Sequence, residues 1–246
     1  MSGRSTPPLA APVRPSVAVI MPVLNEAHGL EAAVRALDGS GLTEIVIVDG
    51  GSMDATLAIA RRLAMTADRA VPVRVVQCEA GRALQMNRGA SGARADVLLF
   101  LHADTVLPPG AVDSIRAAIR GGRTWGRFDV RLDGQRAWFR VIERMMNLRS
   151  ALTGIATGDQ AMFVLRDTFT MLGGFAPLPL MEDIDLSRRL KWTGGPAIIR
   201  MPVVTSARRW RAGGVGRTVL RMWVLRLLYS LGVAPARLAG FYRHVR

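Results

Sequence analysis

Hydrophobic residues in the first half of the chain form short continuous runs separated by segments with helical spacing. The runs occupy Val17–Met21, Glu44–Val48, Val73–Val76 and Val97–Leu101. After the first run, Leu30, Ala33, Val34 and Leu37 recur at the spacing of a helix with one buried face. Strands that are apolar on both faces are typical of a parallel sheet covered by helices. The pattern therefore predicts an α/β fold with a mostly parallel central sheet flanked by helices.

The pattern changes after Gly121. Residues 125–132 alternate as a strand with one polar face, and Trp138–Met146 has the spacing of an amphipathic helix. The next expected elements are a strand over Gln160–Leu165, a helix within 181–192 and a strand over Ala197–Met201. No internal repeat is visible, and no linker separates two halves. We therefore expect a disordered leader over residues 1–15, one domain over 16–205 and a basic helical tail over 206–246.

Positive charge is concentrated in the last quarter of the chain. The formal net charge is +14, and 13 of the 33 basic residues follow Asp185, whereas none of the 19 acidic residues does. Such a tail can meet nucleic acid, an acidic ligand such as a diphosphate, or an anionic membrane surface. Nucleic acid is not expected as a partner, because aromatic residues make up only 6% of the chain and no nucleic-acid-binding motif is present.

The single cysteine and the hydropathy of the chain exclude further classes. Cys78 alone cannot form an internal disulfide or a cysteine-rich metal site. The N-terminal segment lacks the apolar core of a signal peptide, and no segment has the roughly 18–20 uninterrupted apolar residues of a membrane-spanning helix. We therefore expect a cytoplasmic protein, located at the inner face of the cell membrane if one of its substrates is a lipid.

Polar side chains follow three of the expected parallel strands. The loops read "PVLNEA" after the first strand, "DGGSMDAT" after the second and "HADT" after the fourth. Ligands of such sheets bind beyond the carboxyl ends of the strands. Asp49, followed by two glycines, can accept hydrogen bonds from a base or a ribose, although a glycine-rich turn with a capping Asp is the alternative. Asp104 is a hard oxygen ligand of the kind that Mg²⁺ or Mn²⁺ takes when phosphates and water complete the coordination, and a plain polar loop is the alternative.

Several motifs together resemble those of family 2 glycosyltransferases. The segments are "MPVLNEAHGLEAAVRAL", "EIVIVDGGSMDAT", "GRALQMNRGASGARADVLLFLHADT" and "MEDIDLSRRL". They occur in the order and approximate spacing of that family, whose fold is the nucleotide-diphospho-sugar transferase (GT-A) fold. The resemblance covers about Ser16 to Pro202. It is most specific to small bacterial members that carry "HADT", "GDQAMF" and "SARRW", some of which are associated with arsenosugar or carotenoid glycosylation.

The resemblance implies a nucleotide site and a metal site. The implied nucleotide contacts are Pro22, Asn25, Glu26, Asp49, Gly50, Gly51, Arg82, Asn87 and His102. His102 stands where the family's Asp-x-Asp motif has its first Asp, and an imidazole can also contact ribose. Asp104 keeps the second Asp, which implies a divalent cation, Mn²⁺ or Mg²⁺, that bridges the diphosphate.

On the acceptor side, the resemblance implies a general base at Asp183 with Glu182 as its orienting neighbour. Acids in the first turn of a helix are the alternative interpretation. Gly158, Asp159 and Gln160 fall where the family contacts acceptor and sugar, although Asp159 could be a turn residue. Arg208 and Arg209, in "SARRW", can neutralise a leaving diphosphate or form a solvated basic loop.

The implied activity is inverting, metal-dependent transfer of a sugar from a nucleotide-diphosphate donor, with a UDP-sugar favoured, to a small-molecule or lipid hydroxyl. One alternative is transfer to a polyprenyl phosphate, for which a base matters less because the acceptor is already ionised. A nucleotidyltransferase is a further alternative, but "PVLNEA" lacks the Gly-rich, basic loop of those enzymes. The tail could pack on the domain, lie in a membrane interface or form a dimer contact.

Overall fold

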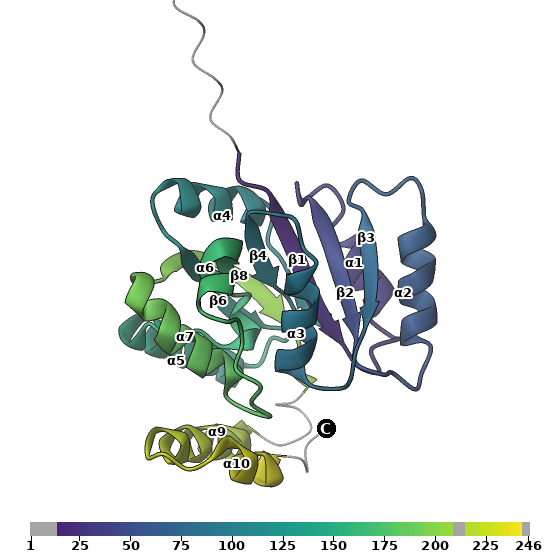
Figure 1. Ribbon diagram of the computed structural model, residues 1–246. Helices are drawn as coiled ribbons and strands as arrows, with labels where there is room; N and C mark the ends of the chain where they lie inside the picture. Colours follow the sequence, from purple (N-terminus) through teal and green to yellow (C-terminus); the bar gives the residue numbers. More distant parts are fainter. Residues whose placement is uncertain (1–13, 209–214, 243–246) are drawn as a thin grey trace, which may run out of the picture.

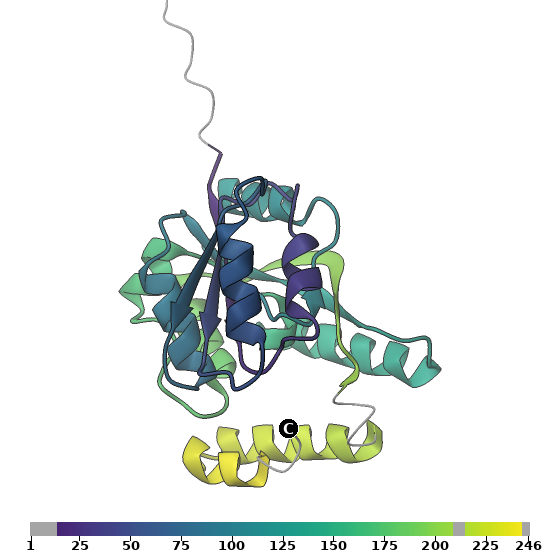
Figure 2. The same ribbon diagram turned by 90° about the vertical axis from the view of Figure 1, so that its right-hand side faces the viewer.

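The computed structural model describes residues 14–208 and 215–242. Most of the leader predicted over 1–15, and residues 209–214 and 243–246 of the predicted tail, lie outside the described residues. Figures 1 and 2 show one mixed sheet with helices on both faces and a pair of helices, α9 and α10, beside it.

Eight strands form the sheet in the order β3-β2-β1-β4-β7-β6-β8-β5. Their bounds are β1 Val17–Val23, β2 Glu44–Asp49, β3 Val73–Gln77, β4 Val97–Phe100, β5 Thr105–Val106, β6 Trp125–Leu132, β7 Phe163–Leu165 and β8 Ala197–Thr205. Strands β1 to β4 are parallel, and β6 and β8 are parallel to each other. The short strand β7 runs antiparallel between β4 and β6, and β5 pairs antiparallel with β8. The predicted α/β fold with a mostly parallel sheet is therefore confirmed.

The helices cover the sheet because both faces of its central strands are apolar. Along β1, Val17 and Val19 pack into one core cluster and Ala18 and Ile20 into the other. The first cluster includes residues of α1 (Leu30–Arg35), α2 (Thr56–Met65) and α4 (Ala111–Arg120). The second includes residues of α3 (Arg82–Ser91), α6 (Arg166–Met171) and α7 (Glu182–Leu190). The two layers fix the positions from which the strand-end loops project.

The second half departs from the predicted boundaries in three places. The helix predicted over Trp138–Met146 extends over Ala137–Thr153 as α5, and the strand predicted over Ala197–Met201 continues to Thr205. The strand predicted over Gln160–Leu165 is wrong at its start, because residues Gly158–Gln160 form a 3₁₀ turn, η1. Thr157 and Gln160 form a reciprocal capping box across that turn, and Ala161 follows with a positive φ of 44°.

Residues 215–242 contain two helices. They are α9 (Val215–Ser230) and α10 (Pro235–Tyr242). Leu225 and Leu238 pack with Met181 and Ile184, so the pair lies against the start of α7. In Figure 1 it lies on the side towards which the parallel strands point. Within residues 14–208 and 215–242, no helix is both long and apolar enough to cross a membrane.

Candidate active site

The loops after β1 and β2 are tied to each other by side chains. The backbone N–H of Asn25 donates to Ser52 Oγ at 2.9 Å, and Asn25 Oδ1 accepts from the N–H of Met53 at 2.9 Å. Asn25 has a positive φ of 54°, a conformation that Asn tolerates better than most residues. The two loops that were predicted to bind a nucleotide therefore form one structural unit.

Asp49 lies at the tip of β2 and is fully buried. Its Oδ2 accepts from the N–H groups of Gly51 and Ser52, each at 3.1 Å. Its Oδ1 is also buried, and it has no hydrogen-bond partner in the described part of the chain. A buried carboxylate oxygen without a donor is costly, so this atom is suited to accept a hydrogen bond from a ligand.

Gln85 is a residue of this region that sequence reasoning missed. Its Nε2 donates to the carbonyl oxygens of Val23 at 2.8 Å and Val48 at 2.9 Å. A Cβ atom at Gly50 would lie 2.9 Å from Gln85 Cδ, so the glycine gives the amide its space. Gln85 therefore holds the ends of β1 and β2 together. Its position within "GRALQMN" was the only sequence signal for it.

Asn87, on the same helix, holds a different loop. Its Nδ2 donates to the carbonyl oxygen of Phe175 at 2.8 Å, and its Oδ1 accepts from the N–H of Phe175 at 2.9 Å. The side chain thus anchors the segment that leads into α7. Its predicted contact with a nucleoside stays a prediction.

Arg208 joins two of the predicted loops. Its Nη2 lies 3.1 Å from Glu26 Oε1 and 3.7 Å from Asp104 Oδ2. The backbone N–H of Ser206 also donates to the carbonyl oxygen of Asp104 at 3.1 Å. The structure therefore brings the first loop, the "HADT" loop and the start of the predicted tail together. Arg209 lies outside the described residues.

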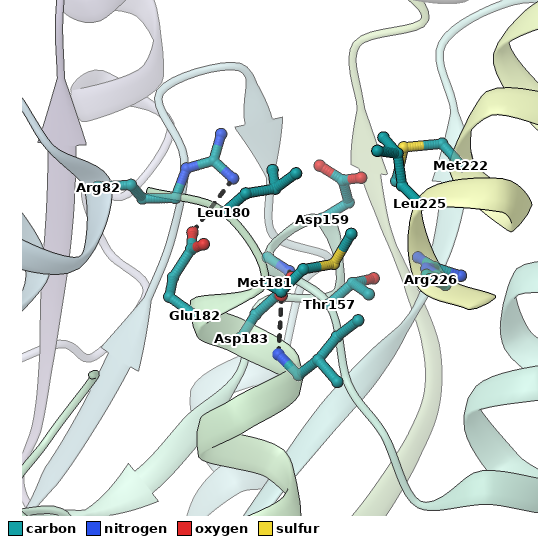
Figure 3. A pocket seen from close by; sticks show the side chains of 12 residues that line it. Arg82, Thr157, Asp159, Leu180, Met181, Glu182, Asp183, Met222, Leu225 and Arg226 are labelled. Atoms are coloured by element: carbon teal, nitrogen blue, oxygen red, sulfur yellow. Dashed lines mark hydrogen bonds and ion pairs between the residues drawn. The ribbon is translucent and has the colours of Figure 1, made fainter. Parts of the chain in front are cut away.

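The predicted donor and acceptor sides meet at Gly158. The backbone N–H of Gly158 donates to Asp183 Oδ2 at 2.9 Å. A Cβ atom at Gly158 would lie 2.8 Å from His102 Nε2 and 3.8 Å from Arg82 Nη1, so both side chains lie against this residue. The buried Glu182 carboxylate is 3.6 Å from Arg82 Nη1. Figure 3 shows Arg82 and Glu182 facing each other beside the segment that contains Asp159.

A pocket opens at this junction. It is lined by Arg82, Thr157, Gly158, Asp159, Leu180, Met181, Glu182, Asp183, Ile184, Met222, Leu225 and Arg226. The lining contains five predicted site residues, and α9 supplies the last three of its members. Asp49, His102 and Asp104 do not line it; His102 contacts Gly158 at its edge.

The metal prediction rests on few ligands. Among residues 14–208 and 215–242, no group of three or more His, Cys, Asp or Glu side chains is close enough to hold an ion. Any cation at Asp104 would therefore need ligands from a bound molecule or water.

An open α/β sheet with carboxylates, an imidazole and arginines beyond its strand ends defines a class of enzyme that binds a charged ligand at that edge. Residues 18–172 match the family model described as glycosyl transferase family 2, and the chain belongs to this family. The match confirms the family that the motifs indicated.

Curated relatives share part of this region. The chain is 31% identical over 153 residues to an undecaprenyl-phosphate 4-deoxy-4-formamido-L-arabinose transferase of Pseudomonas syringae pv. syringae, a match that covers 58% of this chain and 44% of the relative. An enzyme of the same name from Edwardsiella ictaluri is 30% identical over 148 residues, with the same coverage. The chain thus spans less than half the length of these relatives.

Solved structures confirm the GT-A fold. S. aureus TarS 1–349 superposes with a TM-score of 0.64 at 16% identity, covering 87% of this chain and 65% of that chain. The mannosyltransferase PcManGT from Pyrobaculum calidifontis, solved with GDP-Man and Mn²⁺, superposes with a TM-score of 0.62 at 24% identity, covering 93% and 69%. At these identities the likeness concerns the fold, and the roles of individual residues stay predictions.

The Gln85→Leu variant tests the clamp between β1 and β2. Loss of the two donated hydrogen bonds leaves buried carbonyl oxygens less satisfied, which should lower the free energy of unfolding by about 1–3 kcal/mol. Urea unfolding measures this change. Gln77→Leu, at an exposed position of β3, is the control and should have little effect. Equal stability of the Gln85 variant and the wild type would contradict the role of the amide.

Proposed function

We propose that the protein transfers a sugar, with inversion, from a nucleotide-diphosphate donor to an oxygen atom of a small-molecule or lipid acceptor. The main support is the arrangement at Gly158. The side chains of His102 and Arg82 lie against this residue, and its backbone N–H donates to Asp183. This arrangement joins the expected donor groups to a carboxylate on the acceptor side. A sugar bound between them would have its reactive carbon open to attack opposite the diphosphate.

The donor half of the proposal rests on the first two loops. The buried Oδ1 of Asp49 is suited to a base N–H or a ribose hydroxyl. TarS has been solved with UDP-GlcNAc and PcManGT with GDP-Man, so neighbours in fold bind nucleotide sugars with either base. We propose a UDP-sugar for this chain, as the sequence resemblance favours. Arg208 is placed to neutralise the diphosphate beside Asp104.

The residues present fit a divalent cation only if a bound ligand and water supply most of its coordination. Asp104 offers one hard oxygen donor, and the carboxylate of Glu26 is held by the same arginine. Such a set suits Mg²⁺ or Mn²⁺ that takes its other ligands from phosphate oxygens and water. When bound, the cation would neutralise charge on the leaving diphosphate. PcManGT was solved with Mn²⁺, which supports the choice of metal.

Asp183 is the proposed base if the acceptor is a hydroxyl. Its two oxygens accept from the N–H groups of Gly158 and Ile184, at 2.9 and 2.8 Å, which fixes the carboxylate at the pocket wall. The hydroxyl must lose a proton as it attacks the anomeric carbon, and a positioned carboxylate can take it. Glu182 and Arg82 pair beside it and orient the start of α7.

A phosphate acceptor is the second candidate, because the curated relatives are named undecaprenyl-phosphate transferases. A phosphate oxygen is already ionised, so this variant of the reaction needs no base. The nucleotidyltransferase alternative has no such support.

A lipid acceptor would require contact with a membrane surface, and two helices present suitable faces. On α5 the exposed residues Trp138, Val141, Met145, Leu148 and Leu152 recur at intervals of three and four. On α9, Leu220, Trp223, Val224 and Leu227 do the same. Apolar stripes flanked by arginine are typical of helices that lie in a membrane interface. We propose peripheral binding to the inner face of the cell membrane.

The Asp104→Ala variant tests the metal assignment. Binding of UDP with Mn²⁺, measured by isothermal titration calorimetry, should weaken about tenfold or more, because the cation loses its charged protein ligand. Asp167→Ala, at an exposed carboxylate on α6, should bind like the wild type. Unchanged affinity of the Asp104 variant would remove Asp104 from the metal site.

The Asp183→Asn variant separates the two acceptor types. With a hydroxyl acceptor, kcat should fall by about 10²–10⁴-fold, since asparagine cannot take the proton. With a phosphate acceptor, most activity should remain. Donor affinity should be unchanged in both cases, because the amide oxygen can still accept the N–H of Gly158. A loss of UDP affinity would contradict the placement of Asp183 on the acceptor side.

Flotation with anionic liposomes tests the membrane contact of α9. Replacing Trp223 and Leu227 by Ser should reduce the bound fraction, because it removes apolar area from the exposed stripe. The same two substitutions at Trp138 and Leu148 test α5. Binding that is insensitive to both pairs, or binding equally strong to neutral liposomes, would count against an interfacial location.

A further inference from the structure

One arginine that sequence reasoning did not assign, Arg226, lines the pocket on its acceptor side, and a second, Arg149, lies outside the lining but near it. Arg226, on α9, lines the pocket together with Asp159 and Asp183. Figure 3 shows Arg226 and Arg82 entering from opposite sides of the segment that contains Asp159. Arg149, near the end of α5, is close enough to interact electrostatically with both Arg226 and Asp183. Two helices distant in sequence thus place positive charge beside the proposed acceptor position.

Both guanidinium groups have buried donors without acceptors. Nε and Nη2 of Arg149 and Nε of Arg226 have no hydrogen-bond partner in the described part of the chain. The Nε2 amide nitrogen of Gln160, on the turn that contributes Asp159, is in the same state. No ion pair among the described residues includes Arg149 or Arg226 within 4.0 Å. All of these orphan atoms are donors, so what they lack is an acceptor.

Arg149 and Arg226 keep their positive charge, although burial lowers the pKa of both. Burial, followed by repulsion from Arg226, lowers the pKa of Arg149 to about 10, while Asp183 opposes the shift. Burial also lowers the pKa of Arg226, and Asp183 and Asp159 oppose it. Both groups remain cations at neutral pH. The nearby carboxylate of Asp183 accepts the N–H groups of Gly158 and Ile184, and it accepts no hydrogen bond from the unpartnered Nε and Nη2 donors of the two arginines.

We propose that Arg226 binds the phosphate group of a phosphate-monoester acceptor, and that Arg149, outside the pocket lining, strengthens this binding through its charge. Guanidinium groups donate in a planar fork that matches the oxygens of phosphate. The inference rests on the proposed glycosyl transfer and selects its phosphate variant. A phosphate oxygen bonds to the anomeric carbon, and the bond from that carbon to the donor's diphosphate oxygen breaks, its electron pair leaving with the nucleoside diphosphate. The attacking oxygen is already anionic, so no proton is transferred, and the product is a glycosyl phosphodiester.

The competing explanation is that the arginines only balance the charges of Asp159 and Asp183. That role would affect folding and leave acceptor choice unchanged. The two explanations therefore differ in the Michaelis constant for an anionic acceptor.

The test uses the full chain with Mn²⁺ and the UDP-sugar that it consumes fastest. The acceptors are farnesyl phosphate, its alcohol farnesol, and glycerol 3-phosphate as a water-soluble phosphate monoester. The variants are Arg226→Gln and Arg149→Gln, with Arg226→Lys to restore the charge. Arg221→Gln on α9 and the exposed Arg144→Gln on α5 are matched controls.

The wild type should use farnesyl phosphate and leave farnesol unmodified. Arg226→Gln should raise KM for the phosphate acceptor about 10–100-fold, the loss expected for hydrogen bonds to a charged group. Arg149→Gln should raise KM by a smaller factor, because only a nearby charge is lost. UDP affinity should not change, Arg226→Lys should recover part of the loss, and the controls should behave like the wild type. Formation of a glycosyl phosphodiester from glycerol 3-phosphate as well, and not of a glycoside at one of its hydroxyls, would identify a general phosphate site. Use of farnesyl phosphate alone would identify a lipid headgroup site.

Transfer to farnesol as efficient as to farnesyl phosphate would overturn the inference, even if the variants fail to fold. Unchanged KM in folded Gln variants would overturn it too. In both cases UDP binding and sugar transfer by the wild type would leave the proposed function standing. A wild type that binds no nucleotide in the presence of Mn²⁺ would instead overturn the proposed function itself.

Discussion

The hydrogen bond from the Gly158 N–H to Asp183 is the contact on which the arrangement of the site depends. The absence of a side chain at residue 158 also lets the imidazole of His102 lie against this peptide, since a Cβ atom there would be 2.8 Å from His102 Nε2. His102 lies near the start of the loop after β4, and Asp183 lies in the first turn of α7, so the Gly158 peptide contacts residues from two distant parts of the chain. The ion pair between Arg82, on α3, and Glu182, on α7, is a second contact between these parts of the chain. The expected donor and acceptor residues are therefore linked by direct contacts.

The sequence predicted the elements that form from local pattern. The four runs apolar on both faces became β1 to β4, because continuous apolar segments can be satisfied only inside a sheet covered on both sides. It also predicted which loops would gather, since parallel strands deliver their carboxyl ends to one edge. The loops after β1 and β2 meet for that reason, and Asn25 is hydrogen-bonded to Ser52 and Met53 between them.

The sequence did not predict features that depend on packing between distant elements. Gln85 looks like an ordinary polar helix residue until the ends of β1 and β2 are seen beside it. Arg149 and Arg226 look like surface arginines on amphipathic helices, and only the folded structure shows that some of their donors are buried. The predicted start of β7 was wrong because Gln160 is part of a capping box with Thr157. This local hydrogen bonding holds residues 158–160 in a turn, and the strand begins only at Phe163.

The position of α9 has a consequence for how such proteins diversify. Met222, Leu225 and Arg226 come from one continuous helix, whereas the contacts near Asp49 come from β1, β2 and α3. Changes within this single helix can reshape one wall of the pocket while the loops beyond the first strands keep their geometry. Recombination between β8 and α9 would replace this wall of the pocket in one step and would leave the sequence of the strands and of their loops unchanged.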